Sequence, residues 1–281
     1  MNQDASPADD PEALLHRCAA IDDGEIDLAA AALAFAALAR PEASVAPYLA
    51  HLRALAADVA AGARAGASGI TEQIHILNTV LFEAHGYAGD RETYDDLRNA
   101  NLMSVIDRRR GLPIALAILY VHAARGQGWR IEGINFPGHF LLRLRDGGAG
   151  AVIDPFNGGR VLGAADLREL IKGMEGQSAE LRGEHCQTAG NRQMLLRLQN
   201  NIKLRLLHDD KPAEAVAVVQ HMLLIAPDDP ALWHEAGILH GRIGNLRAAV
   251  AALEKLAALS RGRAEHRKAV QLLAEMKSQL N

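Results

Sequence analysis

The chain has 281 residues, of which 49% are hydrophobic and 4% aromatic, and its formal net charge is −4. This composition supports a large core of Ala, Leu, Ile and Val, which favours helices, and the charge excludes the basic surface typical of nucleic-acid binding. No run of about 18 apolar residues is present, so no membrane span is predicted.

Helices are predicted for most of the first part of the chain. Residues 1–10 are acidic and polar, unlike a secretory signal peptide, and we expect them to be disordered. Beyond them, apolar residues recur at helical rather than alternating spacing. The predicted helical segments are residues 11–40, 45–65, 71–85 and, as a polar helix or turn, 94–107.

A buried helix is predicted to begin at Pro113. Proline suits the first position of a helix because it lacks the N–H group that would be unpaired there. From Ile114 to Val121 every residue is apolar or tyrosine, which indicates a helix buried on most sides. Three short strands follow, which we expect to form one antiparallel sheet packed on this helix; they are residues 131–136, 139–144 and 151–154.

The C-terminal third shows a repeat. After a polar, glycine-containing linker at residues 174–190, Ala215 and Ala249 stand 34 residues apart in matching contexts. Pro227 and Trp233 occupy the positions expected of the terminal proline and the tryptophan in a tetratricopeptide repeat. The spacing therefore predicts about two such repeats, which offer a surface for a protein or peptide partner.

The strongest chemical signal is a histidine and an aspartate on neighbouring strands. His139 lies near the start of one strand, Asp154 lies at the end of the next, and the glycine-rich residues 146–150 supply the turn between them. An imidazole oriented by a carboxylate is the base and orienting half of a nucleophilic triad. The same pair, however, also fits a purely architectural role in which it pins two strands together.

Four separated motifs resemble the SirB1 family, a bacterial-type family. They are residues 77–90, 109–116, 133–141 and 154–159. The resemblance implies an α+β fold: a helix-rich transglutaminase-like (papain-like) domain with a small antiparallel sheet, then an all-α tetratricopeptide-like domain. We expect an N-terminal extension over residues 1–40 and the two domains over residues 41–175 and 190–281.

The resemblance also implies a Cys-His-Asp triad, and this chain departs from it. The cysteine of such a triad sits at the start of the buried helix, which places its position near Pro113. No Cys, Ser or Thr lies between Asp107 and Arg160. Without a thiolate, His139 and Asp154 have nothing to activate.

Three functional hypotheses follow from this departure. The first is a non-catalytic binding or regulatory protein, a pseudoenzyme, whose pocket is lined by Pro113, His139, Asp154 and Asn78 and whose repeats bind a protein partner. The second is a hydrolase in which His139, oriented by Asp154, acts as general base toward water. The third is a structural partner that acts only through its repeats.

Several features stay open or are set aside. For Asn78 we hold two alternatives equal: the side chain faces the pocket, or it lies on the helix surface. Cys186 lies in the predicted linker, where no strand or helix positions it as a substitute nucleophile. The two cysteines have no metal-ligand spacing, so we expect a reduced, cytoplasmic protein with no metal and no cofactor.

Overall fold

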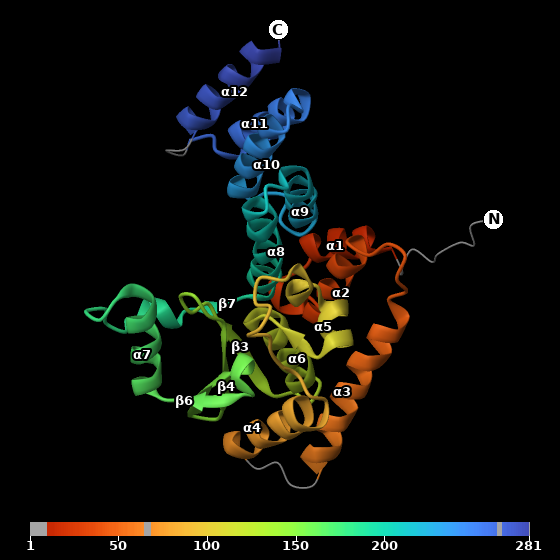
Figure 1. Ribbon diagram of the computed structural model, residues 1–281, viewed down its shortest axis with the longest axis vertical. Coiled ribbons are helices and arrows are strands. Elements are labelled where there is room, and N and C mark those ends of the chain that lie inside the picture. The colour runs from red at the N-terminus through yellow and green to blue at the C-terminus, as the bar shows by residue number, and fades with distance from the viewer. Residues whose placement is uncertain (1–9, 65–68, 263–265, 281) are drawn as a thin grey trace, which may run out of the picture. The chain divides into compact units, whose positions relative to one another are not determined.

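The computed structural model describes residues 10–64, 69–262 and 266–280 (Figure 1). Its internal contacts divide the chain into two compact units. One unit is Asp22–Leu198, which we call the central unit. The other joins Met1–Ile21 to Gln199–Asn281, and we call it the repeat unit.

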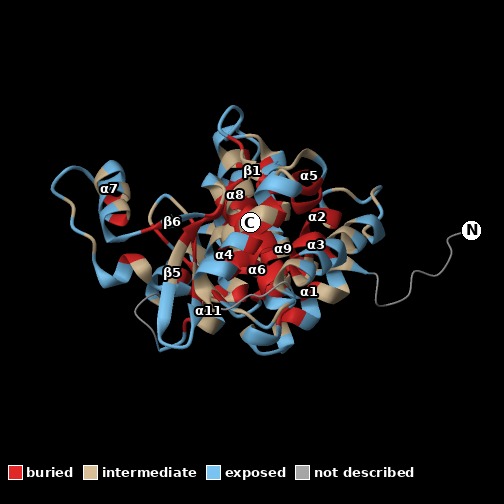
Figure 2. Ribbon diagram, turned by 90° about the horizontal axis from the view of Figure 1, so that it is seen from below, coloured by how far each residue is buried: buried red, intermediate tan, exposed pale blue. Residues whose placement is uncertain are grey.

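The central unit is organised around α6 (Pro113–Arg125), of which every residue except His122 and Arg125 is buried (Figure 2). Pro113 opens this helix, as the sequence predicts. The other helical elements of this unit precede or follow it along the chain. They are η1 (Asp23–Glu25), α2 (Leu28–Leu38), α3 (Ala46–Arg64), α4 (Ile70–Asn78), the π-helix η2 (Thr79–Ala84), η3 (Leu97–Ala100), α5 (Leu102–Arg108), η4 (Pro155–Asn157), α7 (Ala164–Glu175) and η5 (Gly183–Cys186).

A five-stranded antiparallel sheet lies between α6 and α7 (Figure 1). Its strand order is β6-β5-β4-β3-β7, with bounds β3 (Arg130–Ile134), β4 (Leu141–Asp146), β5 (Ala149–Asp154), β6 (Arg160–Leu162) and β7 (Thr188–Ala189). An apolar cluster that includes Ile134, Leu141 and Ile171 joins the sheet to α7. A separate parallel pair, β1 (Ala88–Gly89) and β2 (Arg110–Gly111), precedes α6.

The repeat unit consists of helices. The boundary between the units falls inside α8 (Asn191–His208), and α9 (Pro212–Ile225), α10 (Pro230–Arg242), α11 (Leu246–Leu259) and α12 (His266–Leu280) follow. Helix α1 (Pro11–Ala20), from the other end of the chain, packs on α9. A Cβ at Gly237 would lie 2.7 Å from Leu253, so the small residue permits the close approach of α10 and α11.

The predicted fold class is confirmed, and the structure corrects three local predictions. Residues 11–40 are not one helix: extended backbone at Ile21, Asp22, Ile26 and Asp27 splits the segment into α1, η1 and α2, and the Asp27 side chain caps α2. The sheet has five strands rather than three, since the short β6 and β7 carry no detectable pattern. The predicted linker at 174–190 contains β7, whose Ala189 pairs with Gly133.

Two predictions stay untested. The predicted disorder of residues 1–10 falls almost wholly outside the described residues, of which Asp10 is the first and caps α1. The predicted domain boundaries at residues 40, 175 and 190 remain a prediction, because the two units are defined by their internal contacts and not as domains. No helix in the described part of the chain is long and apolar enough to span a membrane.

Candidate functional site

A tight turn before β4 presents His139. The His139 backbone N–H donates to the Phe136 carbonyl at 3.2 Å, and Phe136 itself is fully buried. Gly138 has φ 63°, and a Cβ there would lie 2.1 Å from Cε of Met174. The positive φ favours glycine, and a larger residue would displace the flexible Met174 side chain. The turn thus fixes His139 just outside the strand, rather than within it as the sequence analysis expected.

Asp154 ends β5 and caps the short helix η4. Its Oδ1 accepts from the Phe156 N–H at 3.0 Å, and its Oδ2 accepts from the Asn157 amide at 2.5 Å. The pairing of Leu142 with Ile153 sets the register of β4 on β5, so the residues just before β4 lie beside the end of β5. The carboxylate is therefore held in place independently of the histidine.

The structure brings His139 and Asp154 together. His139 Nε2 lies 2.9 Å from Asp154 Oδ1, and the two side chains are 18% and 3% exposed. Nε2 is buried, and Asp154 Oδ1 is the acidic group at ion-pair distance from it. The exposed 18% of the His139 side chain therefore belongs to atoms other than Nε2.

The carboxylate stays ionised despite its burial. Burial raises the pKa of Asp154, but His139, the Asn157 amide and the Phe156 N–H outweigh this effect and hold the pKa below its ordinary value. Nearby, burial raises the pKa of Tyr120, and the Asp154 charge raises it further. The site therefore holds a fixed negative charge beside a neutral phenol.

Aromatic rings line the histidine. The Phe156 ring lies edge-on to His139 with centroids 6.0 Å apart, and Tyr94 lies edge-on to Phe156 at 5.9 Å. Phe156 also covers Gly89, where a Cβ would lie 2.5 Å from the ring. Gly89 pairs with Gly111, two residues before Pro113. This series of contacts links the start of α6 to the histidine.

At the start of α6 the side chain is a buried pyrrolidine ring, which is no nucleophile. The preceding Leu112 gives no side-chain cap, and its own N–H donates to the Asn99 carbonyl at 2.9 Å. The position that the resemblance assigns to a catalytic cysteine therefore carries an apolar group.

Asn78 faces the interior beside the pair. Its amide donates to the Gly159 carbonyl at 3.0 Å, and its Oδ1 accepts from the Tyr120 hydroxyl at 3.3 Å. The Gly159 N–H in turn donates to the Asp154 carbonyl at 2.8 Å. Of the two readings of Asn78, the structure thus favours the inward one, in which the side chain holds the loop after Asp154.

Arg197 is a supporting residue that sequence reasoning missed. From α8 its guanidinium donates to the His139 carbonyl at 2.7 Å and to the Phe136 carbonyl at 3.4 Å, and it contacts the Asn135 side chain. Burial lowers its pKa, an effect that Tyr94 partly opposes. No local pattern marks Arg197, because its role depends on a contact 58 residues away in sequence.

The remaining candidate groups lie elsewhere. Cys186 packs on the apolar cluster between the sheet and α7, and both cysteines are free. Among the residues that the structure describes, no three His, Cys, Asp or Glu side chains lie close enough to hold a metal ion.

Comparison with known proteins gives two family matches. The profile described as Transglutaminase-like superfamily matches residues 46–200, and the profile described as Tetratricopeptide repeat matches residues 202–276. The first match covers the segment that holds Asn78, Pro113, His139 and Asp154. The second covers the C-terminal end of α8, the whole of α9, α10 and α11, and most of α12.

Curated relatives include a UPF0162 protein of Xylella fastidiosa strain Temecula1, 33% identical over 182 residues, or 64% of this chain and 65% of that protein. A UPF0162 protein of Vibrio cholerae is 30% identical over 165 residues, 58% of this chain and 61% of that protein. The aligned part of the chain thus spans somewhat less than two thirds of these relatives.

Two further likenesses are of other kinds, one over a shorter segment and one in structure alone. F-box only protein 21 of Mus musculus is 37% identical over 101 residues, which is 34% of this chain and 16% of that protein. A crystal structure of menin, described as revealing the binding site for Mixed Lineage Leukemia (MLL) protein, covers 90% of this chain and 70% of its own, with 9% identity and a TM-score of 0.41. At that TM-score the structural likeness carries no argument.

Proposed function

We propose that this chain, which belongs to the transglutaminase-like superfamily, is a non-catalytic binding protein on a transglutaminase-like scaffold. The observation that carries the proposal is the His139–Asp154 pair at 2.9 Å together with a buried proline at the start of α6. The base and its orienting carboxylate are present, but the nucleophile position is apolar. A triad without its nucleophile has no acyl acceptor.

The surroundings of the pair support an architectural use. Asp154 already caps η4, Asn78 holds the loop that follows it, and Arg197 fixes the turn that carries His139. Each of these contacts would order the scaffold whether or not chemistry occurs. The pair therefore stabilises the junction of β4 and β5 and shapes the surface next to α6.

The proposed partner is a protein or peptide that binds through the tetratricopeptide region. Stacked helix pairs of this kind present extended surfaces to other chains. The two free cysteines support a reducing compartment, which we propose to be the cytoplasm. The motifs shared with the SirB1 family make that family our proposal for the closer grouping.

Enzyme assays test the proposal directly. The purified full chain is incubated with a peptide amide and with a glutamine donor plus a primary amine, and hydrolysis and transamidation are followed by mass spectrometry. We expect equal background rates for the wild type and the His139→Ala variant. His75→Ala, an exposed histidine on α4, serves as the matched control. Turnover that disappears in His139→Ala but persists in His75→Ala would overturn the proposal.

One observation favours a second candidate, a hydrolase with His139 as general base toward water. Nε2 is buried against Asp154 while part of the ring stays exposed, so the nitrogen that does not face Asp154 is left to accept a proton. This candidate predicts hydrolysis that survives in a Cys18→Ser, Cys186→Ser double variant and is lost in His139→Ala. Loss in the cysteine variant instead would indicate a thiol nucleophile.

A further inference from the structure

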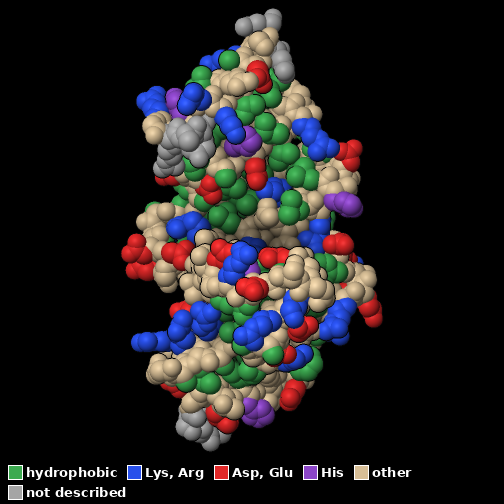
Figure 3. All heavy atoms as spheres, turned by 90° about the vertical axis from the view of Figure 1, so that its left-hand side faces the viewer, with side chains coloured by type: hydrophobic (Ala, Val, Ile, Leu, Met, Phe, Trp, Pro, Cys, Tyr) green, Lys and Arg blue, Asp and Glu red, His purple; other side chains and the backbone are tan. Residues whose placement is uncertain are grey.

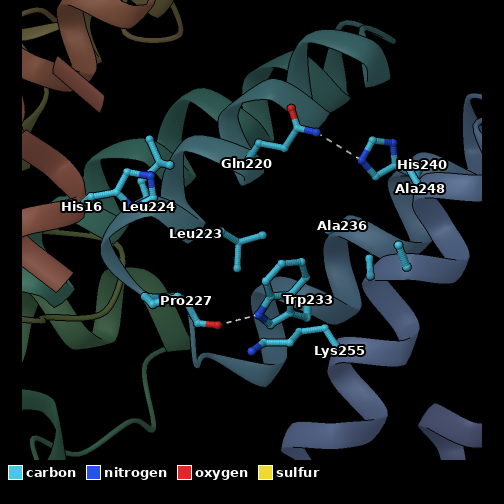
Figure 4. Close-up of a pocket in the computed structure, with 12 residues that line it drawn as sticks. His16, Gln220, Leu223, Leu224, Pro227, Trp233, Ala236, His240, Ala248 and Lys255 are labelled. Atoms are coloured by element: carbon cyan, nitrogen blue, oxygen red, sulfur yellow. Dashed lines mark hydrogen bonds between the residues drawn. The ribbon is translucent and has the colours of Figure 1, made fainter. Parts of the chain in front are cut away.

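A pocket of about 640 Å³ lies within the repeat unit between α9, α10 and α11 (Figure 4). His16, from α1 near the start of the chain, also lines it. This volume lies in the range of sites that enclose a ligand or a large side chain. The N-terminal helix thus contributes to a concave surface that the C-terminal helices otherwise form.

The walls of the pocket are apolar and fixed. Leu223 points into the open space, and Trp233 forms one side (Figure 4). The indole N–H of Trp233 donates to the Pro227 carbonyl at 2.7 Å, which holds the ring in place. The alanines of α10 and α11 leave room that larger residues would fill; they are Ala236, Ala248, Ala251 and Ala252.

A buried histidine at the pocket is incompletely paired. His240 is only 7% exposed, and its Nδ1 is buried without a hydrogen-bond partner. Its other ring nitrogen lies 3.4 Å from the Gln220 amide, as the dashed line in Figure 4 marks. Burial lowers the pKa of His240, so the ring is neutral near pH 7. The neutral ring therefore adds no positive charge to the wall of the pocket.

The charge of the lining is one-sided. Lys255 extends beside Trp233, and none of the twelve lining residues is acidic (Figure 4). Within the described part of the chain, Lys255 has no carboxylate at ion-pair distance, since the adjacent Glu254 contacts Lys277 at 2.7 Å instead. An apolar cavity with an uncompensated cation at its edge is complementary to an apolar group that carries a negative charge.

We propose that this pocket binds a segment of a protein partner in which a bulky aliphatic side chain lies next to a carboxylate. The aliphatic group fills the space beside Trp233 and Leu223, and the carboxylate pairs with Lys255. The proposal rests on the proposed function only in taking the ligand to be a protein. It requires nothing of the pair at His139.

The test uses three fluorescein-labelled eight-residue peptides and the full chain, with binding followed by fluorescence anisotropy. The first peptide alternates leucine and glutamate, the second leucine and lysine, and the third serine and glutamate. We expect the leucine–glutamate peptide to bind at least about tenfold more tightly than the other two, because the second peptide replaces the attraction to Lys255 by a repulsion and the third lacks the aliphatic side chain. Equal binding of all three, or no binding at millimolar concentration, would overturn the proposal.

Variants then assign the binding to the pocket. Lys255→Gln should weaken the leucine–glutamate peptide about threefold to fivefold, the usual size for one partly exposed ion pair. Lys268→Gln is the matched control, because Lys268 is an exposed lysine that lines a different pocket of the same unit. Ala251 is exposed at the pocket, so Ala251→Phe fills the space without burying new groups in the core and should reduce binding more than about tenfold.

Two outcomes contradict the assignment. If Lys268→Gln weakens binding as much as Lys255→Gln, only the overall charge matters and the pocket is not the site. If the wild type self-associates in sedimentation and Ala251→Phe makes it monomeric, the occupant is a second copy of the chain. Either result leaves the outcome of the enzyme assays at His139 unchanged, so the pocket proposal can fail while the proposed function stands.

Discussion

The charged groups at the candidate sites of the two units are arranged differently. In the central unit the buried charges are paired: Asp90 accepts from Arg108 at 2.8 Å and from the Thr93 hydroxyl at 2.7 Å, and Asp154 is similarly occupied, although Gln73 Oε1 and Thr79 Oγ1 are buried there without a hydrogen-bond partner. At the pocket of the repeat unit, by contrast, Lys255 is exposed and has no carboxylate at ion-pair distance among the described residues. Elsewhere in that unit, buried Lys203 is paired with Glu235.

This contrast separates architecture from binding. Paired buried charges order a scaffold, whereas a cation without a partner beside an apolar pocket leaves an interaction for a ligand to make. Large apolar side chains are exposed in both units, including Phe82 and Met174 in the central unit and Leu204 and Val270 in the repeat unit, and Figure 3 shows green side chains in both its upper and its lower half. We therefore expect substitutions in the central unit to change stability and substitutions at the pocket to change binding.

The largest effect is expected at Arg108. Its guanidinium contacts Asp90 and the Asn99 side chain, and Arg108→Ala leaves the buried Asp90 carboxylate without its cation. The free energy of unfolding in urea should fall by about 3–5 kcal/mol, the usual cost of breaking a buried ion pair on one side. Arg160→Ala removes an exposed partner of Asp166 and should cost at most about 1 kcal/mol. Equal losses would contradict the contrast.

Acid should destabilise the central unit through the same groups. Burial raises the pKa of Asp90, but hydrogen bonds from Thr93, Arg108 and Asn99 outweigh it and hold the pKa well below the ordinary value. The pKa of Asp154 is lowered as well. A carboxyl whose folded pKa is depressed contributes stability above its unfolded pKa of about 4 and loses it as the pH falls through the folded value.

The measurement is the free energy of unfolding as a function of pH. It should begin to decrease near pH 6.5, because burial lowers the pKa of His51, His221 and His240 and the unfolded chain therefore binds these protons first. It should fall more steeply below about pH 5, where the unfolded carboxyls bind protons before the folded ones. Asp90→Asn should flatten the decrease below pH 4, and Glu92→Gln, at an exposed carboxylate of the same loop, should leave it unchanged. A curve for Asp90→Asn that parallels the wild type would show that this carboxyl does not carry the acid sensitivity.

A smaller loss is expected at Gly159, which has φ 72° and lies against Asn78. A Cβ at residue 159 would lie 1.8 Å from Asn78 Oδ1, so Gly159→Ala should cost about 2–3 kcal/mol from strain and overpacking. Gly147→Ala is the control, because Gly147 has φ 55° and open space around it, and should cost about 1 kcal/mol. Thermal melts compare the two variants, and equal losses of stability would mean that the Asn78 side chain moves aside without a loss of stability.

His139→Ala should cost only about 1 kcal/mol, since Asp154 keeps its contacts to Phe156 and Asn157. The pKa of Asp154 should rise toward its ordinary value when the imidazole is lost, which NMR titration of the carboxyl carbon would detect. Peptide binding at the repeat unit should be unchanged. An unchanged Asp154 titration would mean that the pair does not interact in solution.

The smallest effect on stability is expected for Lys255→Gln. Lys255 is exposed and has no ion-pair partner among the described residues, so the free energy of unfolding should change by less than about 0.5 kcal/mol. Its effect on peptide binding should nevertheless be measurable. A large loss of stability would show that the lysine supports the fold rather than a ligand.

Sequence reasoning located what depends on local pattern. The proline start and unbroken apolar run predicted α6, the turn residues around His139 and Asp154 predicted their approach, and the 34-residue spacing predicted the repeats. It missed what depends on distant contacts: α1 joins α9, β7 pairs with β3, and Arg197 reaches the His139 turn from α8. Two-residue strands and a single arginine carry no periodic signal.

The most direct test of the central claim is whether His139 activates any nucleophile of this chain. The wild type and His139→Ala are incubated with p-nitrophenyl acetate, and the burst of nitrophenolate and the intact mass are recorded. We predict identical bursts and identical acetyl incorporation, because the start of α6 offers no acceptor. A burst and an acetylated residue that are present in the wild type and absent in His139→Ala would contradict the account.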